Sequence, residues 1–187
     1  MESPFYIFDF DDTLVDSGAK VIINRKSGET EYVTSRQYRD YERSLSQPGD
    51  VLDFAEFDVY PPDASIIKSV WSKMESALKQ HGSERVIVLT ARANPAPVAK
   101  FLSDYGVNPM PKIEAVGSSD PRAKYVKALE YVEKLNADVV YVWEDSPNNI
   151  VAIEQLKSDN VKVVSHLVNE GLLFSYIKNI LKEFRLA

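Results

Sequence analysis

The sequence contains no cysteine, which excludes disulfide bonds, thiolate metal sites and cysteine nucleophiles. It also lacks an apolar run long enough to span a membrane, and its first residues, MESPFYIF, fit neither a signal peptide nor a membrane anchor. We therefore expect a cytoplasmic protein with no membrane partner. Positive charge is scarce, since 22 Lys and Arg stand against 28 Asp and Glu. The resulting net charge of -6 argues against a surface dedicated to nucleic acid.

What is present is typical of a globular protein: 187 residues, 44% of them hydrophobic, without internal repeats or low-complexity tracts. Short apolar runs predict buried strands at residues 5–10, 85–92, 138–145 and 161–168, with a weaker candidate at 112–117. These runs are almost continuously apolar and most are rich in Val, Ile and Tyr. They therefore favour parallel strands that are buried on both faces. No feature specifies an oligomeric state.

Amphipathic patterns between these runs predict helices over residues 63–82, 94–106, 120–136, 146–158 and 169–184. Two of these helices have clear boundaries. Asn94 and Pro95 open one that Gly106 ends, and Asp120 with Pro121 opens another. The alternation predicts an α/β protein with a three-layer, Rossmann-like parallel sheet and helices on both faces.

One segment interrupts the alternation, and we interpret residues 18–62 as a small insertion after the first strand. Two β-like runs within residues 20–37 flank a turn at 26–29 and predict a β-hairpin. A short helix over 35–45 and a loop over 47–63, rich in Pro and Asp, are expected to follow. The insertion is too small for an independent domain, so the chain 1–187 is expected to form a single domain.

Polar side chains follow the predicted strands or open a helix beside them. Ligands bind at the carboxyl ends of parallel strands, so we expect these side chains to meet at one edge of the sheet. They are Asp9, Asp11, Thr90, Lys124, Glu144 and Asp145.

Clustered carboxylates repel one another unless a proton or a cation lies among them. With only oxygen ligands available, the expected cation is Mg²⁺, held by Asp9 and Asp145. Asp9 could then attack phosphorus and form an aspartyl-phosphate. Asp11 could protonate the leaving oxygen and later deprotonate water. Thr90 and Lys124 are expected to bind the transferred phosphoryl group. The pattern predicts a Mg²⁺-dependent phosphomonoester hydrolase.

These residues resemble the motifs of the haloacid dehalogenase (HAD) superfamily, whose phosphatases carry Asp-x-Asp-x-Thr after the first strand. DFDDT at 9–13 matches this motif, and VWEDSPNNI at 142–150 resembles the final acidic motif. Thr90 and Lys124 resemble the Thr and Lys motifs. The resemblance spans the chain from about residue 4 to residue 168 and implies a phosphatase, because the dehalogenases lack the second Asp. It also implies that the insertion acts as a cap and that the main-chain carbonyl of Asp11 binds the metal.

Four other residues near these motifs need an interpretation. Asp12 stands where many members of the superfamily have Gly, and no role is assigned to it. Asn149 stands where Asp is common, and it could orient Lys124 or a metal-bound water. Glu144 is expected near the metal through water. Arg92 could contact the substrate or form an ion pair at the surface.

The substrate class stays open between a small phosphorylated compound or nucleotide and the 3′ or 5′ end of a nucleic acid. Residues 18–43 contain six Lys and Arg against four Asp and Glu, which suits a phosphate-rich ligand. A solvated hairpin of mixed charge would produce the same pattern.

Two interpretations without hydrolysis are also considered. A signalling receiver domain uses Asp, Mg²⁺, Thr and Lys, but its accepting Asp ends a middle strand and precedes the Thr. Here the remaining acidic motif follows Thr90, and the chain is too long. A HAD-like fold could also be kept only for binding, although the complete set of reactive residues argues against this.

Overall fold

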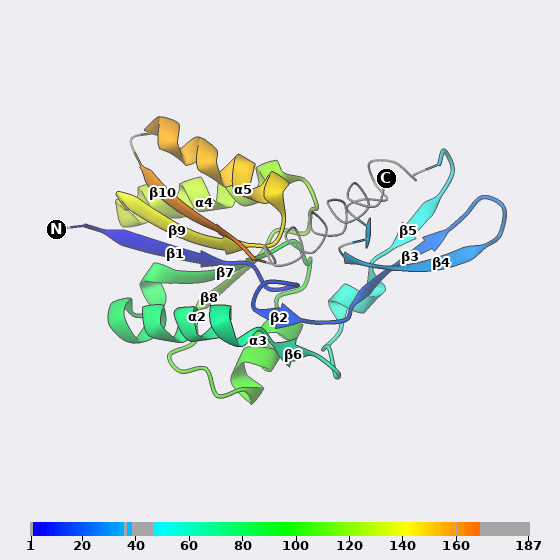
Figure 1. Cartoon of the computed structure of the whole chain (residues 1–187), viewed down its shortest axis with the longest axis horizontal. Helices are drawn as coiled ribbons and strands as arrows, with labels where there is room; N and C mark the ends of the chain where they lie inside the picture. Colours follow the sequence, from blue (N-terminus) through cyan, green and yellow to red (C-terminus); the bar gives the residue numbers. More distant parts are fainter. Residues whose placement is uncertain (1, 36, 39–46, 160, 169–187) are drawn as a thin grey trace, which may run out of the picture.

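The computed structural model describes residues 2–35, 37–38, 47–159 and 161–168. At its centre is a five-stranded parallel sheet with the strand order β10-β9-β1-β7-β8 (Figure 1). Its strands are β1 (Pro4–Phe8), β7 (Val86–Thr90), β8 (Lys112–Ala115), β9 (Val139–Glu144) and β10 (Lys162–Leu167). The prediction of parallel strands is confirmed, including the weaker candidate that became β8.

Helices cover both faces of this sheet (Figure 1). They are α2 (Lys68–His81) and α3 (Ala96–Asp104) on one face, and α4 (Pro121–Leu135) and α5 (Pro147–Ile153) on the other. Alternate residues of β1 point to opposite faces. Phe8 packs with α2 and α3, whereas Phe5 and Ile7 pack with α4 and α5. The α/β class and the helices flanking a parallel sheet are therefore confirmed, and this arrangement is compatible with a Rossmann-like fold.

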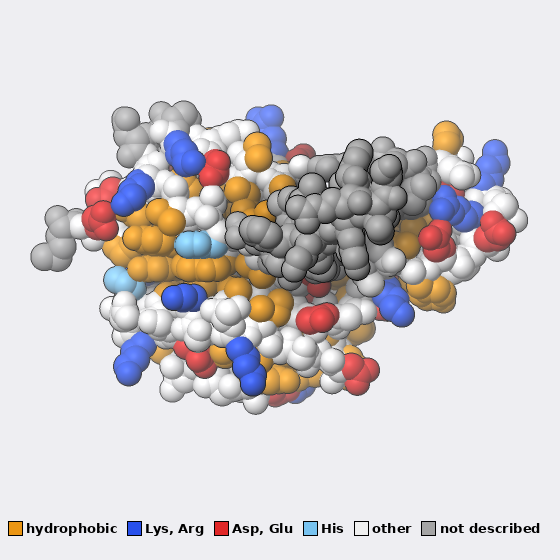
Figure 2. All heavy atoms as spheres, viewed as in Figure 1, with side chains coloured by type: hydrophobic (Ala, Val, Ile, Leu, Met, Phe, Trp, Pro, Cys, Tyr) orange, Lys and Arg blue, Asp and Glu red, His pale blue; other side chains and the backbone are white. Residues whose placement is uncertain are grey.

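A row of stacked rings crosses the sheet on the side of α2. Tyr6 stacks on His81 and on Tyr141, at centroid distances of 5.0 and 5.1 Å, and Trp143 stacks on His166 at 4.7 Å. Figure 2 shows hydrophobic side chains gathered around the histidines on this face. These aromatic residues therefore contribute to packing along the strands.

The insertion forms a second sheet, which is antiparallel. The predicted hairpin is present as β3 (Lys20–Asn24) and β4 (Thr30–Thr34). The prediction of a loop over 47–63 is wrong in part, because β5 (Val51–Asp53) pairs with the other edge of β3 and the 3₁₀ helix η1 (Ala55–Asp58) follows it. The backbone of β3 thus provides the hydrogen-bond partners of β5, and the sequence of this short acidic segment does not by itself indicate them.

Some helix boundaries differ from the predictions. The helix expected from residue 63 begins at Lys68, because β6 (Ser65–Ile66) pairs with β2 (Val15–Asp16) and the Ile67 amide donates to the Leu14 carbonyl at 2.8 Å. These backbone bonds to the loop after β1 replace the first helical turn. The strand β7 is preceded by η2 (Ser83–Arg85), and α5 continues as η3 (Glu154–Asp159).

Two predicted helices fall where the chain is not described. The helix over 169–184 lies wholly outside the described residues, and the one over 35–45 lies largely outside them. None of the helices in the described part of the chain is long and apolar enough to cross a membrane.

Candidate functional site

A cavity of about 750 Å³ lies beyond the carboxyl ends of β1, β7 and β9, and residues of the insertion form part of its wall. Its size is within the range of sites for small molecules and cofactors. Every residue predicted for the site lines this cavity: Asp9, Asp11, Thr90, Arg92, Lys124, Glu144, Asp145 and Asn149. The sheet edge therefore brings together residues that are far apart in the sequence.

The ammonium group of Lys124 joins two carboxylates at the floor of the site. Its Nζ donates to Asp9 Oδ1 at 2.6 Å and to Glu144 Oε2 at 2.8 Å, and the Lys124 side chain is only 3% exposed. Asp120 caps α4 by accepting from the Arg122 amide, which places Lys124 in the first turn of the helix. One side chain thus connects β1, β9 and α4.

Burial and mutual charge determine how these groups titrate. Burial raises the pKa of Asp9 to about 7, the Glu144 carboxylate adds to this rise, and Lys124 opposes it. Burial also acts to raise the pKa of Glu144, but Lys124 and hydrogen bonds, including one with Asn149, hold it below the ordinary value. Burial alone would lower the pKa of Lys124, whereas Asp9 and Glu144 raise it. Lys124 therefore stays charged, and Asp9 is protonated before Glu144 as the pH falls.

Three carboxylates form a cluster that could hold a cation. Asp9, Glu144 and Asp145 each offer one oxygen, and these oxygens lie within 4.8 Å of one another. The single ammonium of Lys124 does not balance three negative charges. An oxygen-only donor set with excess negative charge suits Mg²⁺. Since Glu144 already accepts from Lys124 and from the Ser146 amide, it is better placed to support the site than to bind the ion directly.

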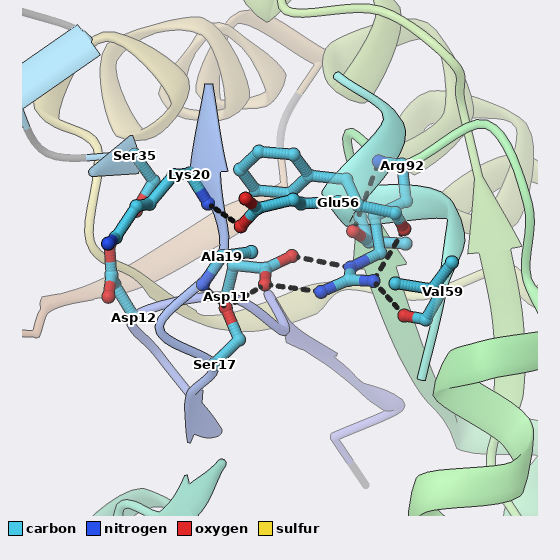
Figure 3. A network of polar contacts seen from close by, with 11 residues as sticks. Asp11, Asp12, Ser17, Ala19, Lys20, Ser35, Glu56, Val59 and Arg92 are labelled. Carbon is cyan, nitrogen blue, oxygen red and sulfur yellow. Dashed lines mark hydrogen bonds and ion pairs between the residues drawn. The ribbon is translucent and has the colours of Figure 1, made fainter. Parts of the chain in front are cut away.

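Asp11 forms a two-pronged ion pair with Arg92. Its carboxylate accepts from Arg92 Nε at 2.8 Å and from Nη2 at 2.7 Å, and the hydroxyl of Ser17 also donates to it at 2.5 Å. Arg92 is 3% exposed, and its Nη1 donates to the carbonyls of Phe57 and Val59 (Figure 3). Of the two alternatives for Arg92, the geometry favours an ion pair, and this pair is buried.

Thr90 ends β7 at the cavity and is almost fully buried. Its Oγ1 accepts a hydrogen bond from the Arg92 amide at 3.2 Å. Because a hydroxyl is both an acceptor and a donor, its own hydrogen can still be directed toward a bound oxygen. The side chain is thus suited to contact a phosphoryl group.

Asp12 links the loop after β1 to the antiparallel sheet. It has a φ of 57°, a conformation that Gly adopts freely and that Asp tolerates better than most residues. Its carboxylate accepts a short hydrogen bond from the hydroxyl of Ser35, which follows β4 (Figure 3). Within the insertion, the Lys20 amide donates to Glu56 at 2.8 Å and connects β3 to η1. The residue without an assigned role therefore helps to hold the insertion in place.

The sequence did not indicate the aromatic residues of the cavity wall. Tyr38, Phe54 and Phe57 come from the insertion and line the same cavity as the carboxylates. The acidic run that contains Phe54 and Phe57 has no periodic pattern, so the sequence predicts a loop there. Two aromatic residues three positions apart among acids were the one available signal.

No protein-family model, curated protein or solved structure matches this chain. The site is therefore interpreted from its own geometry and chemistry.

We expect Lys124→Met to destabilise the protein by about 3–5 kcal/mol at neutral pH, because Asp9 and Glu144 would stay buried without a compensating charge. In the variant, the carboxyl pKa values in the folded state rise above those in the unfolded state. Stability should therefore recover as the pH falls toward about 5. Urea unfolding at several pH values measures both effects.

Lys127→Met is the matched control on the same helix, because Lys127 forms partly exposed ion pairs with Glu130 and Glu114. Its effect should stay within about 1 kcal/mol at every pH. Equal losses in the two variants, or a loss in Lys124→Met that does not change with pH, would contradict the compensating role of Lys124.

Proposed function

We propose that the protein is a Mg²⁺-dependent phosphomonoester hydrolase that acts through an aspartyl-phosphate on Asp9. The observation that carries this proposal is the position of Asp9. It contacts the ammonium of Lys124 and belongs to a cluster of oxygen ligands at the floor of a cavity of about 750 Å³. A nucleophilic carboxylate, a fixed positive charge and a place for a cation are the requirements of phosphoryl transfer. The HAD-like motifs support the same interpretation.

The cavity residues have separate roles in this proposal. Asp9 and Asp145, with the main-chain carbonyl of Asp11, would hold Mg²⁺. The bound ion would supply positive charge to the phosphoryl oxygens. Lys124 binds a phosphoryl oxygen while it holds the Asp9 carboxylate in position, and Thr90 donates its hydroxyl hydrogen to another oxygen.

The proposed reaction has two steps. In the first, an oxygen of Asp9 attacks phosphorus and the bond from phosphorus to the ester oxygen breaks. Asp11, which takes up a proton from solvent water when it leaves Arg92, gives that proton to the leaving oxygen. In the second, Asp11 takes a proton from water while the water attacks phosphorus. Inorganic phosphate and the free Asp9 carboxylate result. For both steps Asp11 must exchange an Arg92 contact for the reacting oxygen.

The insertion would act as a cap in this scheme. Arg92 holds Asp11 and also the carbonyls of Phe57 and Val59, so release of Asp11 is linked to the position of η1. Substrate that draws Asp11 away from Arg92 would remove the carboxylate that fixes this guanidinium against the Phe57 and Val59 carbonyls of the insertion. We therefore propose that residues 18–62 respond to substrate binding.

The charge of the described hairpin gives little support to a nucleic-acid end as substrate. Arg25 pairs with Glu31 at 2.7 Å and with Asp50 at 3.0 Å, so its charge is balanced locally. The other basic residues that suggested a phosphate-rich ligand include Arg36, Arg39 and Arg43, which lie outside the described residues. The hairpin that is described fits a solvated surface of mixed charge.

Mg²⁺ should stabilise the protein more at about pH 8 than at about pH 6, because the ion binds the deprotonated carboxylates. Without metal, the raised pKa of Asp9 favours folding at low pH. That contribution is lost as the pH rises through about 7. At 100 times its dissociation constant, Mg²⁺ should raise Tm by about 5–10 °C, measured by calorimetry.

Asp145→Asn should remove most of this rise, whereas Asp58→Asn should retain it, because Asp58 lines the cavity outside the carboxylate cluster. The same Tm rise in wild type and Asp145→Asn, or a rise that decreases with pH, would contradict the metal site.

Asp9→Asn should reduce phosphate release from p-nitrophenyl phosphate by about 10³-fold or more, since it removes the proposed nucleophile. Wild type should lose its activity in EDTA and regain it when Mg²⁺ is added. Asp16→Asn is the control, because Asp16 is an exposed carboxylate on β2 that does not line the cavity. Activity that survives in Asp9→Asn, or that is indifferent to EDTA, would refute the proposed function.

A further inference from the structure

The cavity has a second wall that the proposed chemistry does not use. Phe54 lies between β5 and η1, lines the cavity and is 40% exposed. The ring of Tyr38 meets it edge-on at 5.4 Å and 88°, and the ring of Phe57 lies 6.3 Å away. Tyr38 itself is buried in the core of the insertion. Phe54 is therefore an exposed aromatic ring that two neighbouring rings hold in position.

This wall continues toward the reacting groups. The guanidinium of Arg92 lies over the Phe57 ring at 5.5 Å and over the Phe10 ring at 5.2 Å, and the same guanidinium pairs with Asp11. A flat group stacked on Phe54 would thus lie in the same cavity as the proposed acid and base. A substrate with a planar ring and a phosphate would place the ring on the aromatic wall, formed by Tyr38, Phe54 and Phe57, and the phosphate on the carboxylate floor, formed by Asp9, Glu144 and Asp145.

The charges around the cavity limit how many phosphates the substrate carries. Among the described residues that line it, the cations are Arg92 and Lys124, and both are paired with carboxylates. One phosphate can be accommodated by Lys124 and a bound cation, whereas each further phosphate would need a positive charge of its own. The described site therefore favours a single phosphate over a polynucleotide.

From the aromatic wall, the carboxylate floor and the charge of the cavity, we infer that the substrate is a nucleoside monophosphate whose base stacks on Phe54. This inference rests on the proposed function. A cavity of about 750 Å³ is within the size range of sites that enclose such ligands. Any base can stack on an aromatic side chain, because every base has a π-face. We therefore expect a preference for nucleotides without strong discrimination among the bases.

The test compares adenosine monophosphate with ribose 5-phosphate, which has the same phosphate and sugar but no base. We expect wild type to favour adenosine monophosphate in kcat/KM by about fivefold or more, mainly through KM. Phe54→Ala should bring the ratio close to one, and Phe54→Trp should preserve it. Tyr32→Ala is the control, because Tyr32 is 58% exposed on β4 and does not line the cavity. It should leave the ratio unchanged.

Equal kcat/KM values for the two substrates in wild type, or a preference that survives Phe54→Ala, would overturn the inference. Better turnover of a short oligonucleotide with a terminal phosphate would overturn it in favour of a nucleic-acid end. The same comparison can be made without turnover in the Asp9→Asn background. Calorimetry then measures how both compounds bind in the presence of Mg²⁺, to Asp9→Asn alone and to Asp9→Asn combined with Phe54→Ala. Absence of hydrolysis would thus count against the proposed function, and equal binding would count against stacking on Phe54.

Discussion

The buried contact of Lys124 with Asp9 and Glu144 is the interaction on which the rest of the site depends. It connects the ends of β1 and β9 to the start of α4, at distances of 2.6 and 2.8 Å. Without the ammonium, two carboxylates would face each other in a buried place, and one of them would have to take up a proton. With it, Asp9 can stay close to Asp145, and the remaining negative charge of this cluster is what the proposed cation would balance.

The second constraint is the junction between the two sheets. The Asp11–Arg92 pair reaches the carbonyls of Phe57 and Val59, and Asp12 bonds with Ser35 (Figure 3). These contacts place the insertion beside the carboxylates, and both the parallel sheet edge and the insertion line the cavity. Adjacent acids of one loop therefore have different partners. Asp9 faces Lys124, Asp11 faces Arg92, and Asp12 faces the insertion.

Much of the parallel sheet could be predicted from the sequence, because its central strands are apolar on both faces and stand out as short runs. The meeting of Asp9, Thr90, Lys124 and Asp145 also followed, since parallel strands bring their carboxyl ends to one edge.

The pairing of β5 with β3 could not be predicted, because Val51 and Leu52 are held by a strand edge that only the folded insertion provides. The position of Phe54 in the cavity could not be predicted for the same reason. Its neighbours in space, such as Tyr38, belong to another part of the insertion. Propensity and periodicity describe the contacts of a segment with itself, and these residues depend on contacts between segments.

The proposed mechanism requires Asp9 to carry the phosphoryl group during turnover. Mass spectrometry after a rapid acid quench tests it directly, best in Asp11→Asn, where loss of the base should slow hydrolysis of the intermediate. We expect one phosphoryl group on the peptide that contains Asp9, and none when Asp9→Asn is added. Phosphate release without an adduct on Asp9 in either background, or an adduct on another residue, would contradict it.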